Sequence, residues 1–99
     1  MKEPVRKGYW IGMVDVTDEA SYPQYIAANR AAFDKYGARF LARGGQGEVF
    51  EGPAATRLVV IEFDSYQTAL DCFHSPEYQA ALKLRQAYSK AHFAIVEGV

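Results

Sequence analysis

The chain has 99 residues, of which 49% are hydrophobic and 14% aromatic, and its formal net charge is −1 at pH 7. This length allows one hydrophobic core, so residues 1–99 are predicted to form a single domain. The balanced charge argues against a nucleic-acid partner, and no run approaches the roughly 20 apolar residues of a membrane span. One cysteine, Cys72, excludes an internal disulfide, and no signal peptide is visible. The expected location is therefore the cytoplasm.

The first third of the chain predicts a strand followed by a helix. The strand covers residues 8–16, with its two faces formed by Tyr9, Ile11 and Met13, and by Trp10, Val14 and Val16. The helix is expected to begin between Glu19 and Tyr22, because Pro23 is tolerated only near a helix start. Its buried stripe is predicted to contain Tyr22, Ile26, Asn29, Phe33 and Tyr36. Gly37 follows as a typical C-terminal cap.

The middle of the chain predicts two strands. Residues 38–43 form the second strand, and the glycines at 44, 45 and 47 predict a bulge or bend before a continuation over residues 48–51. Residues 57–64 form the third strand, whose faces carry Val59, Ile61 and Phe63, and Leu58, Val60 and Glu62. Both faces are largely apolar, which is typical of a strand covered on two sides. Glu62 is the exception.

The last third predicts two helical segments and a strand. Ser65 is expected to cap a helix over residues 66–73, with Tyr66, Ala69, Leu70 and Phe73 turned inward. Ser75-Pro76-Glu77 then restarts the helix, with a capping serine, a proline at the first helical position and an acid in the first turn. This second segment runs to about residue 88 and is predicted to bury Tyr78, Ala81 and Leu82. Residues 92–96 form the fourth strand.

The order β-α-β-β-α-β predicts an α+β fold of the ferredoxin-like type, a four-stranded antiparallel sheet with its helices on one face. Such helices leave the other sheet face bare, and an apolar patch of that size exceeds what monomers usually expose. We therefore expect a homodimer that packs through its sheet faces. A standard interface of about 1,600 Å² supplies roughly 20–25 kcal/mol of gross hydrophobic stabilisation, part of which association entropy offsets.

Six short motifs, spread over nearly the whole chain, resemble one bacterial family. They are GYW at residues 8–10, VDVTD at 14–18, YGARFLARGG at 36–45, LVVIEF at 58–63, SPEY at 75–78 and VEG at 96–98. The chain resembles the family called domain of unknown function 1330, of the dimeric α+β barrel superfamily. The resemblance implies two ferredoxin-like subunits whose sheets close one barrel. Superfamily members include cofactor-independent monooxygenases, muconolactone isomerases, chlorite dismutases and stress-responsive barrel proteins.

Glu62 and Arg43 are the first pair of candidate catalytic residues. In a desolvated cavity the pKa of Glu62 would rise, as a general base requires, and Arg43 could stabilise the developing anion. The alternative for Glu62 is a structural ion pair with Arg43 or Arg39. The glycines at 44 and 45 could let the backbone approach a ligand closely, or could simply form a bulge beside a surface arginine.

Other polar and aromatic residues are candidates for ligand contacts. Arg85 could hold an anionic ligand, or lie along the surface with its charge in solvent. Asn29 could contact a ligand or satisfy the backbone, and Trp10 and Tyr25 could line a pocket or belong to the core. His74 could act as an acid or base at a cavity rim, or be a solvated hinge residue. Cys72 and His74 lack a second pair, so no metal site is expected.

These residues leave three functions open. The first is a small-molecule enzyme that needs no cofactor and acts on a planar carbonyl compound in an apolar cavity closed by two sheets. The second is a non-catalytic homodimer that binds a metabolite or stabilises a partner. The third, an RNA-binding module, lacks the basic face and the exposed sheet motif that it would require.

Overall fold

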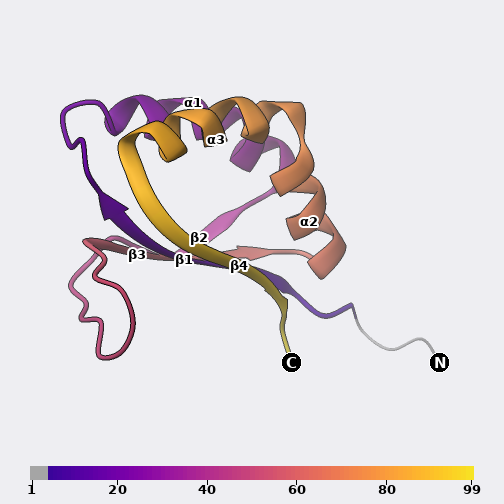
Figure 1. Ribbon diagram of the computed structural model, residues 1–99. Coiled ribbons are helices and arrows are strands. Elements are labelled where there is room, and N and C mark those ends of the chain that lie inside the picture. The colour runs from indigo at the N-terminus through magenta and orange to yellow at the C-terminus, as the bar shows by residue number, and fades with distance from the viewer. Residues whose placement is uncertain (1–4) are drawn as a thin grey trace.

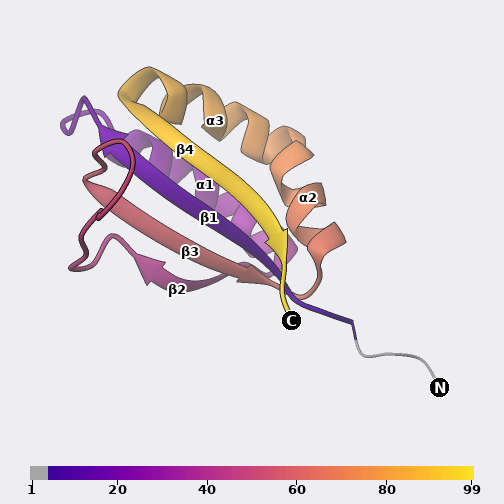
Figure 2. The same cartoon turned by 60° about the horizontal axis from the view of Figure 1, so that its bottom comes forward.

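The computed structural model describes residues 5–99, which form one antiparallel sheet and three helices (Figure 1). In chain order the elements are β1 (Gly8–Val16), α1 (Pro23–Tyr36), β2 (Arg39–Arg43), β3 (Arg57–Phe63), α2 (Tyr66–His74), α3 (Pro76–Tyr88) and β4 (Ser89–Glu97). The strands lie in the order β2-β3-β1-β4 (Figure 2), which is the predicted ferredoxin-like arrangement. All three helices cover the same face of the sheet.

The helix ends follow the local sequence signals. Ser65 and Ser75 cap α2 and α3, each accepting a hydrogen bond from the backbone N–H three residues on, at 3.0 and 3.1 Å. Gly37 ends α1 in the left-handed region at φ 67°, which glycine adopts without steric cost. Helix α1 begins at Pro23, just after the predicted interval, and Tyr22 before it makes no side-chain cap.

Strand β2 differs from the prediction in two ways. It ends at Arg43, and residues 48–51 belong to a long β2–β3 connection instead of continuing the strand. The irregularity in pairing lies between Phe40 and Ala42, not at the glycines. Because Leu41 is the extra residue, Arg39 pairs with Glu62 and Arg43 pairs with Val59, so the two arginines lie on opposite faces of the sheet.

The core lies between the sheet and the helices and is centred on Trp10. Its indole Nε1 donates a hydrogen bond to the backbone oxygen of Ala69 at 2.9 Å. Its ring packs edge-on against Tyr78 and Phe93, with centroid distances of 4.7 and 5.1 Å. On α2 the buried residues are Ala69 and Cys72. The prediction that Tyr66 turns inward is wrong, since Tyr66 is exposed, whereas Leu70 and Phe73 are half-buried.

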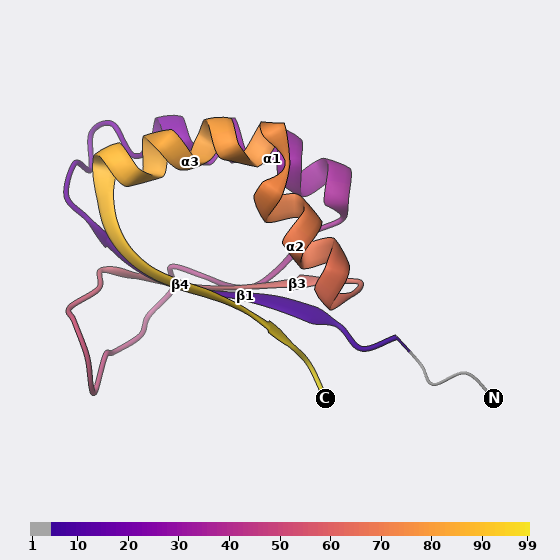
Figure 3. The ribbon, with the colours of Figure 1, turned by 45° about the vertical axis from the view of Figure 1, so that its right-hand side comes forward.

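The opposite, outer face of the sheet has no helix over it within residues 5–99 (Figure 3). The β2–β3 connection extends on this side (Figure 3), and its residues 48–51 line an open hollow together with Ile11, Leu58 and Val60. Ile11 and Val96 are exposed apolar residues of this face. None of the described helices has the length and apolar character needed to cross a membrane.

Candidate functional site

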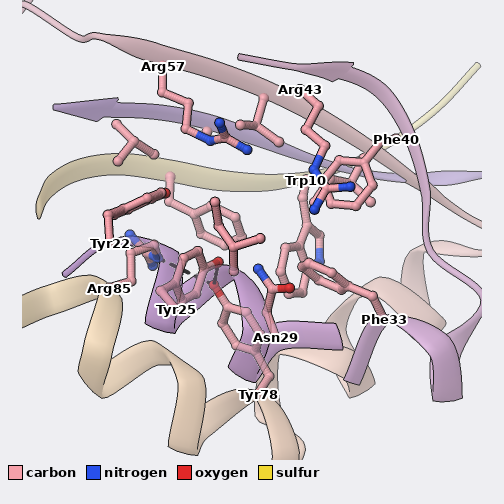
Figure 4. A pocket seen from close by; sticks show the side chains of 16 residues that line it. Trp10, Tyr22, Tyr25, Asn29, Phe33, Phe40, Arg43, Arg57, Tyr78 and Arg85 are labelled. Carbon is pink, nitrogen blue, oxygen red and sulfur yellow. Dashed lines mark hydrogen bonds between the residues drawn. The ribbon is translucent and has the colours of Figure 1, made fainter. Parts of the chain in front are cut away.

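A partly open cavity lies between the helices and the sheet, and many of its lining residues are aromatic (Figure 4). Rings from five elements line it: Trp10, Tyr25, Phe33, Phe40, Tyr78 and Phe93. The volume that the centre of a water molecule can occupy is about 40 Å³, which is enough for a few waters. A larger ligand therefore requires side chains to move. This cavity is on the helix-covered face of a single chain. The predicted cavity between the sheets of two subunits would need a second copy and stays a prediction.

Arg85 brings a buried positive charge to this cavity from α3. The residue is only 8% exposed, and its Nε donates a hydrogen bond to Tyr78 Oη at 3.3 Å. Its guanidinium carbon lies 5.5 Å from the centre of the Phe93 ring. Among the described residues no carboxylate lies within ion-pair distance of it. A buried charge in this position is costly without an anionic partner.

Two more polar side chains reach the cavity from α1. Tyr25 and Tyr78 share a hydrogen bond between their hydroxyl oxygens at 2.9 Å, and both residues are buried. Burial, and then the neighbouring Tyr78, raise the pKa of Tyr25 far above that of an ordinary tyrosine, so its hydroxyl stays neutral. Asn29 lies one turn further along α1, is buried and lines the same cavity (Figure 4).

Arg43 and Arg57 approach the cavity from the sheet side. The Arg43 guanidinium lies 4.1 Å from the Phe40 ring centre, and that of Arg57 lies 5.8 Å from the Tyr22 ring centre. Arg57 and Tyr22 also line a second, open hollow that includes Gly44, so the two spaces adjoin. Three guanidinium groups therefore line one cavity, whose described lining contains no carboxylate, histidine or lysine.

Glu62 lies on the other side of the sheet. Its carboxylate accepts hydrogen bonds from the Tyr9 hydroxyl at 2.9 Å and from Arg39 Nε at 3.0 Å. These contacts, Tyr9 first and then Arg39, hold the pKa of Glu62 below its ordinary value. Of the two alternatives for Glu62, the structure shows the ion pair with Arg39, and the pKa is lowered, opposite to the rise that a general base requires. Glu62 and Arg43 lie on opposite faces of the sheet and do not line the same cavity. Glu62 therefore cannot act as a base beside Arg43 within one chain.

The remaining candidates lie outside the cavity. His74 is exposed at the end of α2 and packs edge-on against Phe73, with centroids 5.3 Å apart. Gly44 lines the open hollow. At Gly45 no atom lies within 4 Å of the position that a Cβ would take, so nothing approaches its backbone closely. Burial, followed by the charge of Glu77, raises the pKa of Cys72 to about 12, so its thiol is protonated. Residues 5–99 contain no cluster of three or more metal-ligating side chains.

The comparisons place the chain in a family. Residues 7–99 match the family of proteins described as domain of unknown function DUF1330. The chain belongs to the DUF1330 family. No curated protein sequence is significantly similar to this DUF1330 chain.

Solved structures with the same fold come from several bacteria. RPA0582 of Rhodopseudomonas palustris, a protein of unknown function, is 16% identical with a TM-score of 0.77 over 95% of this chain and 83% of its own. SnoaB of Streptomyces nogalater, a cofactor-independent oxygenase, is 13% identical with a TM-score of 0.64 over 93% and 92%. A Bacteroides fragilis protein described as dimeric and ferredoxin-like is 14% identical with a TM-score of 0.55 over 92% and 95%. These identities indicate a shared fold.

Five of the nine residues singled out in the sequence lie together in the cavity of this DUF1330 chain: Trp10, Tyr25, Asn29, Arg43 and Arg85. Their functional roles stay predictions. Sequence reasoning missed Arg57 and treated Tyr78 only as core. Arg57 is two residues before Val59 in the same strand, so it shares a face with Val59 and Ile61. This alternation is the signal that could have found Arg57.

Proposed function

We propose that this protein is a small-molecule enzyme that oxygenates a planar phenol or enol in the helix-covered cavity without a bound cofactor. The observation that carries the proposal is Arg85, a buried guanidinium that faces an aromatic cavity and has no carboxylate partner among the described residues. Once side chains move to enlarge the cavity, its aromatic walls suit a flat ring, and the guanidinium selects a ligand that carries negative charge. The fold shared with SnoaB, described as a cofactor-independent oxygenase, supports this reaction class.

The cavity fits a substrate that loses its own proton. None of the described lining residues is a carboxylate, histidine or lysine that could act as an ordinary base. A phenol or enol that ionises near neutral pH needs no such base, because Arg85 and Arg43 stabilise its anion electrostatically. The electron-rich anion then reacts with dioxygen. In balance, the ring CH₂ group of the substrate's keto tautomer and O₂ give a carbonyl group and one water. A C–O double bond forms, two C–H bonds and the O–O bond break, and dioxygen is the oxidant.

A binding screen followed by an oxygen assay tests the proposal. Phenols and enols with two or three fused rings are first ranked by the rise in melting temperature that they cause. The compounds that bind are then incubated with the protein in an oxygen electrode, and the products are separated by mass. We expect oxygen uptake equimolar with product, and little uptake with Arg85→Met. Binding without any consumption of substrate or oxygen contradicts the proposal.

The absence of an ordinary base among the described lining residues also favours a second function, metabolite binding without conversion. In that case the same compounds bind and return unchanged. An intermediate result, loss of substrate with no oxygen uptake, identifies an isomerase, which only moves a proton. The oxygen electrode and the product mass together separate the three outcomes.

We also propose that two copies pack through their outer sheet faces. The exposed apolar residues Ile11 and Val96 support this arrangement, as does the dimeric description of the Bacteroides fragilis protein. Light scattering is expected to give about 22 kDa, twice the chain mass of 11.1 kDa. Ile11→Glu places a charge in the interface and should yield monomers, whereas Lys83→Glu on the exposed side of α3 should not. A monomeric wild-type protein at micromolar concentration contradicts the proposal.

A further inference from the structure

A chain of hydrogen bonds runs from Arg85 through Tyr78 to Tyr25, and its direction can be deduced. A guanidinium has donors only, so Tyr78 Oη accepts the hydrogen bond from Arg85 Nε at 3.3 Å. The next link joins the two tyrosine hydroxyl oxygens at 2.9 Å, and either oxygen can be its donor on distance alone. The position of the Tyr78 proton decides between them.

Tyr78 must donate to Tyr25. The residue is only 1% exposed, and its other hydroxyl contact, Arg85, cannot accept a proton. A buried hydroxyl that donates to nothing costs about 1–3 kcal/mol. Donation to Tyr25 avoids this cost, and the hydroxyl of Tyr25 then accepts from Tyr78. The proton of Tyr25 itself is left for another acceptor, and Tyr25 lines the cavity.

Other donors lie around the same space. The two terminal nitrogen atoms of Arg85 make no ion pair with the described carboxylates. The amide of Asn29, only 5% exposed, lines the cavity beside Tyr25 (Figure 4). The raised pKa of Tyr25 keeps its proton in place at neutral pH, although the contact with Asn29 partly offsets the rise. Donors therefore converge on the cavity, whose described lining supplies no anionic acceptor.

We infer that Tyr25, Asn29 and Arg85 form an oxyanion site that binds the anionic oxygen of a phenolate or enolate ligand. Tyr78 is a positioning residue, because it directs the Tyr25 proton and orients Arg85. The inference rests on the proposed function only for the class of ligand, since it requires the anion to bind and not to react. It assigns the hydroxyl of Tyr25 the role of a donor to the ligand, and not that of a base.

The pKa of a bound phenol tests the site without any turnover. The probe is 4-nitrophenol, whose phenol and phenolate forms absorb at different wavelengths, titrated with pH in the presence and absence of the protein. Donors that favour the phenolate lower the pKa of the bound phenol below its value in buffer. Nitrobenzene, which lacks the hydroxyl group, serves as the neutral reference ligand.

Tyr25→Phe should weaken phenolate binding about tenfold, which equals about one unit in the pKa of the bound phenol. Its affinity for nitrobenzene should stay unchanged. Tyr88→Phe is the matched control, because the Tyr88 hydroxyl contacts Gln24 at 3.5 Å outside the cavity. This variant should behave like wild type. Tyr78→Phe should give a smaller loss than Tyr25→Phe, because the Tyr25 proton remains available to the ligand.

Three results overturn the inference: 4-nitrophenol does not bind at millimolar concentration, its pKa does not fall on binding, or Tyr25→Phe shifts that pKa no more than Tyr88→Phe. These results are distinct from failure of the proposed function. A lowered phenol pKa that depends on Tyr25, with no oxygen uptake by any bound phenol, supports the oxyanion site and rejects the oxygenase.

Discussion

The two faces of the sheet treat their charged residues in opposite ways. On the outer face Glu62 accepts from Tyr9 and Arg39, and Arg39 also pairs with Asp64 at 3.0 Å. On the helix-covered face Arg85 is buried deeper, yet no described carboxylate pairs with it. The more exposed network is satisfied within the chain, whereas the more buried charge is not.

This difference distinguishes charges that have a structural role from a charge that is proposed to bind a ligand. A paired and partly exposed network such as that of Glu62 contributes modestly to stability, and its charges already compensate one another. An unpaired buried guanidinium lowers stability until an anion arrives, and the proposed anionic ligand would supply that partner for Arg85. Tyr9 and Trp10 are neighbours in sequence but belong one to each face, and so they allow a direct comparison.

Trp10→Ala should have the largest effect on stability. It removes a ring that contacts Tyr78 and Phe93 and a buried hydrogen bond to Ala69. We expect the free energy of unfolding, measured in urea, to fall by about 3–5 kcal/mol. Tyr9→Phe on the outer face, which removes only the hydroxyl contact with Glu62, should lose much less. Equal losses would mean that the two faces are not energetically distinct.

Arg85→Met should have the largest effect on ligand affinity. Methionine keeps much of the side-chain volume but removes the charge-assisted contacts with an anionic ligand. Calorimetry with a phenolate ligand should show binding weakened about 100-fold. Arg39→Met is the control, because Arg39 is on the opposite face and paired with Glu62, and it should leave affinity unchanged. Comparable losses in both variants would show that only total charge matters.

Gly44→Ala should have a smaller effect. Its φ of 69° is strained for alanine, and the new Cβ would lie 2.6 Å from Arg57 Nη1. We expect a loss of about 1–2 kcal/mol in stability and a few-fold weaker ligand binding as Arg57 is displaced. Gly45→Ala meets no atom within 4 Å and should match wild type in both measurements. Ligand affinity that is unaffected by Gly44→Ala would remove Arg57 from the site.

The pH dependence of stability should show the smallest effect. The pKa of Glu62 is lowered in the folded state, first by Tyr9 and then by Arg39. The stabilisation is therefore present above the pKa of the unfolded chain and is lost as pH falls through the folded pKa. Urea titrations between about pH 5 and pH 3 should show wild type losing more stability than Glu62→Gln. Parallel curves would mean that the Glu62 pair contributes nothing.

The elements could be predicted from the sequence because their signals are local. The caps at Ser65 and Ser75 and the end of α1 at Gly37 depend on residues a few positions apart. The alternation in β3 likewise grouped Val59 and Ile61 on one face, and both line the cavity. The predicted continuation of β2 over residues 48–51 failed because a short run containing two apolar residues does not reveal whether a partner strand is available.

The cavity could be predicted only in part. One extra residue at Leu41 moves Arg43 to the face opposite Arg39. No residue type in this part of the sequence predicts that irregularity. With Arg43 misplaced, the sequence suggested a pair with Glu62 across an outer cavity. Arg85 and Asn29 were found because each interrupts an apolar helical stripe, a signal that does not depend on strand register.

The central claim is that Arg85 has no anionic partner in the ligand-free protein, and its replacement tests this most directly. The free energy of unfolding of Arg85→Met should be measured in urea without any ligand. We expect a value equal to or above that of wild type, because an uncompensated buried charge is removed. A loss of about 3–5 kcal/mol, the cost of breaking a buried ion pair, would contradict the claim.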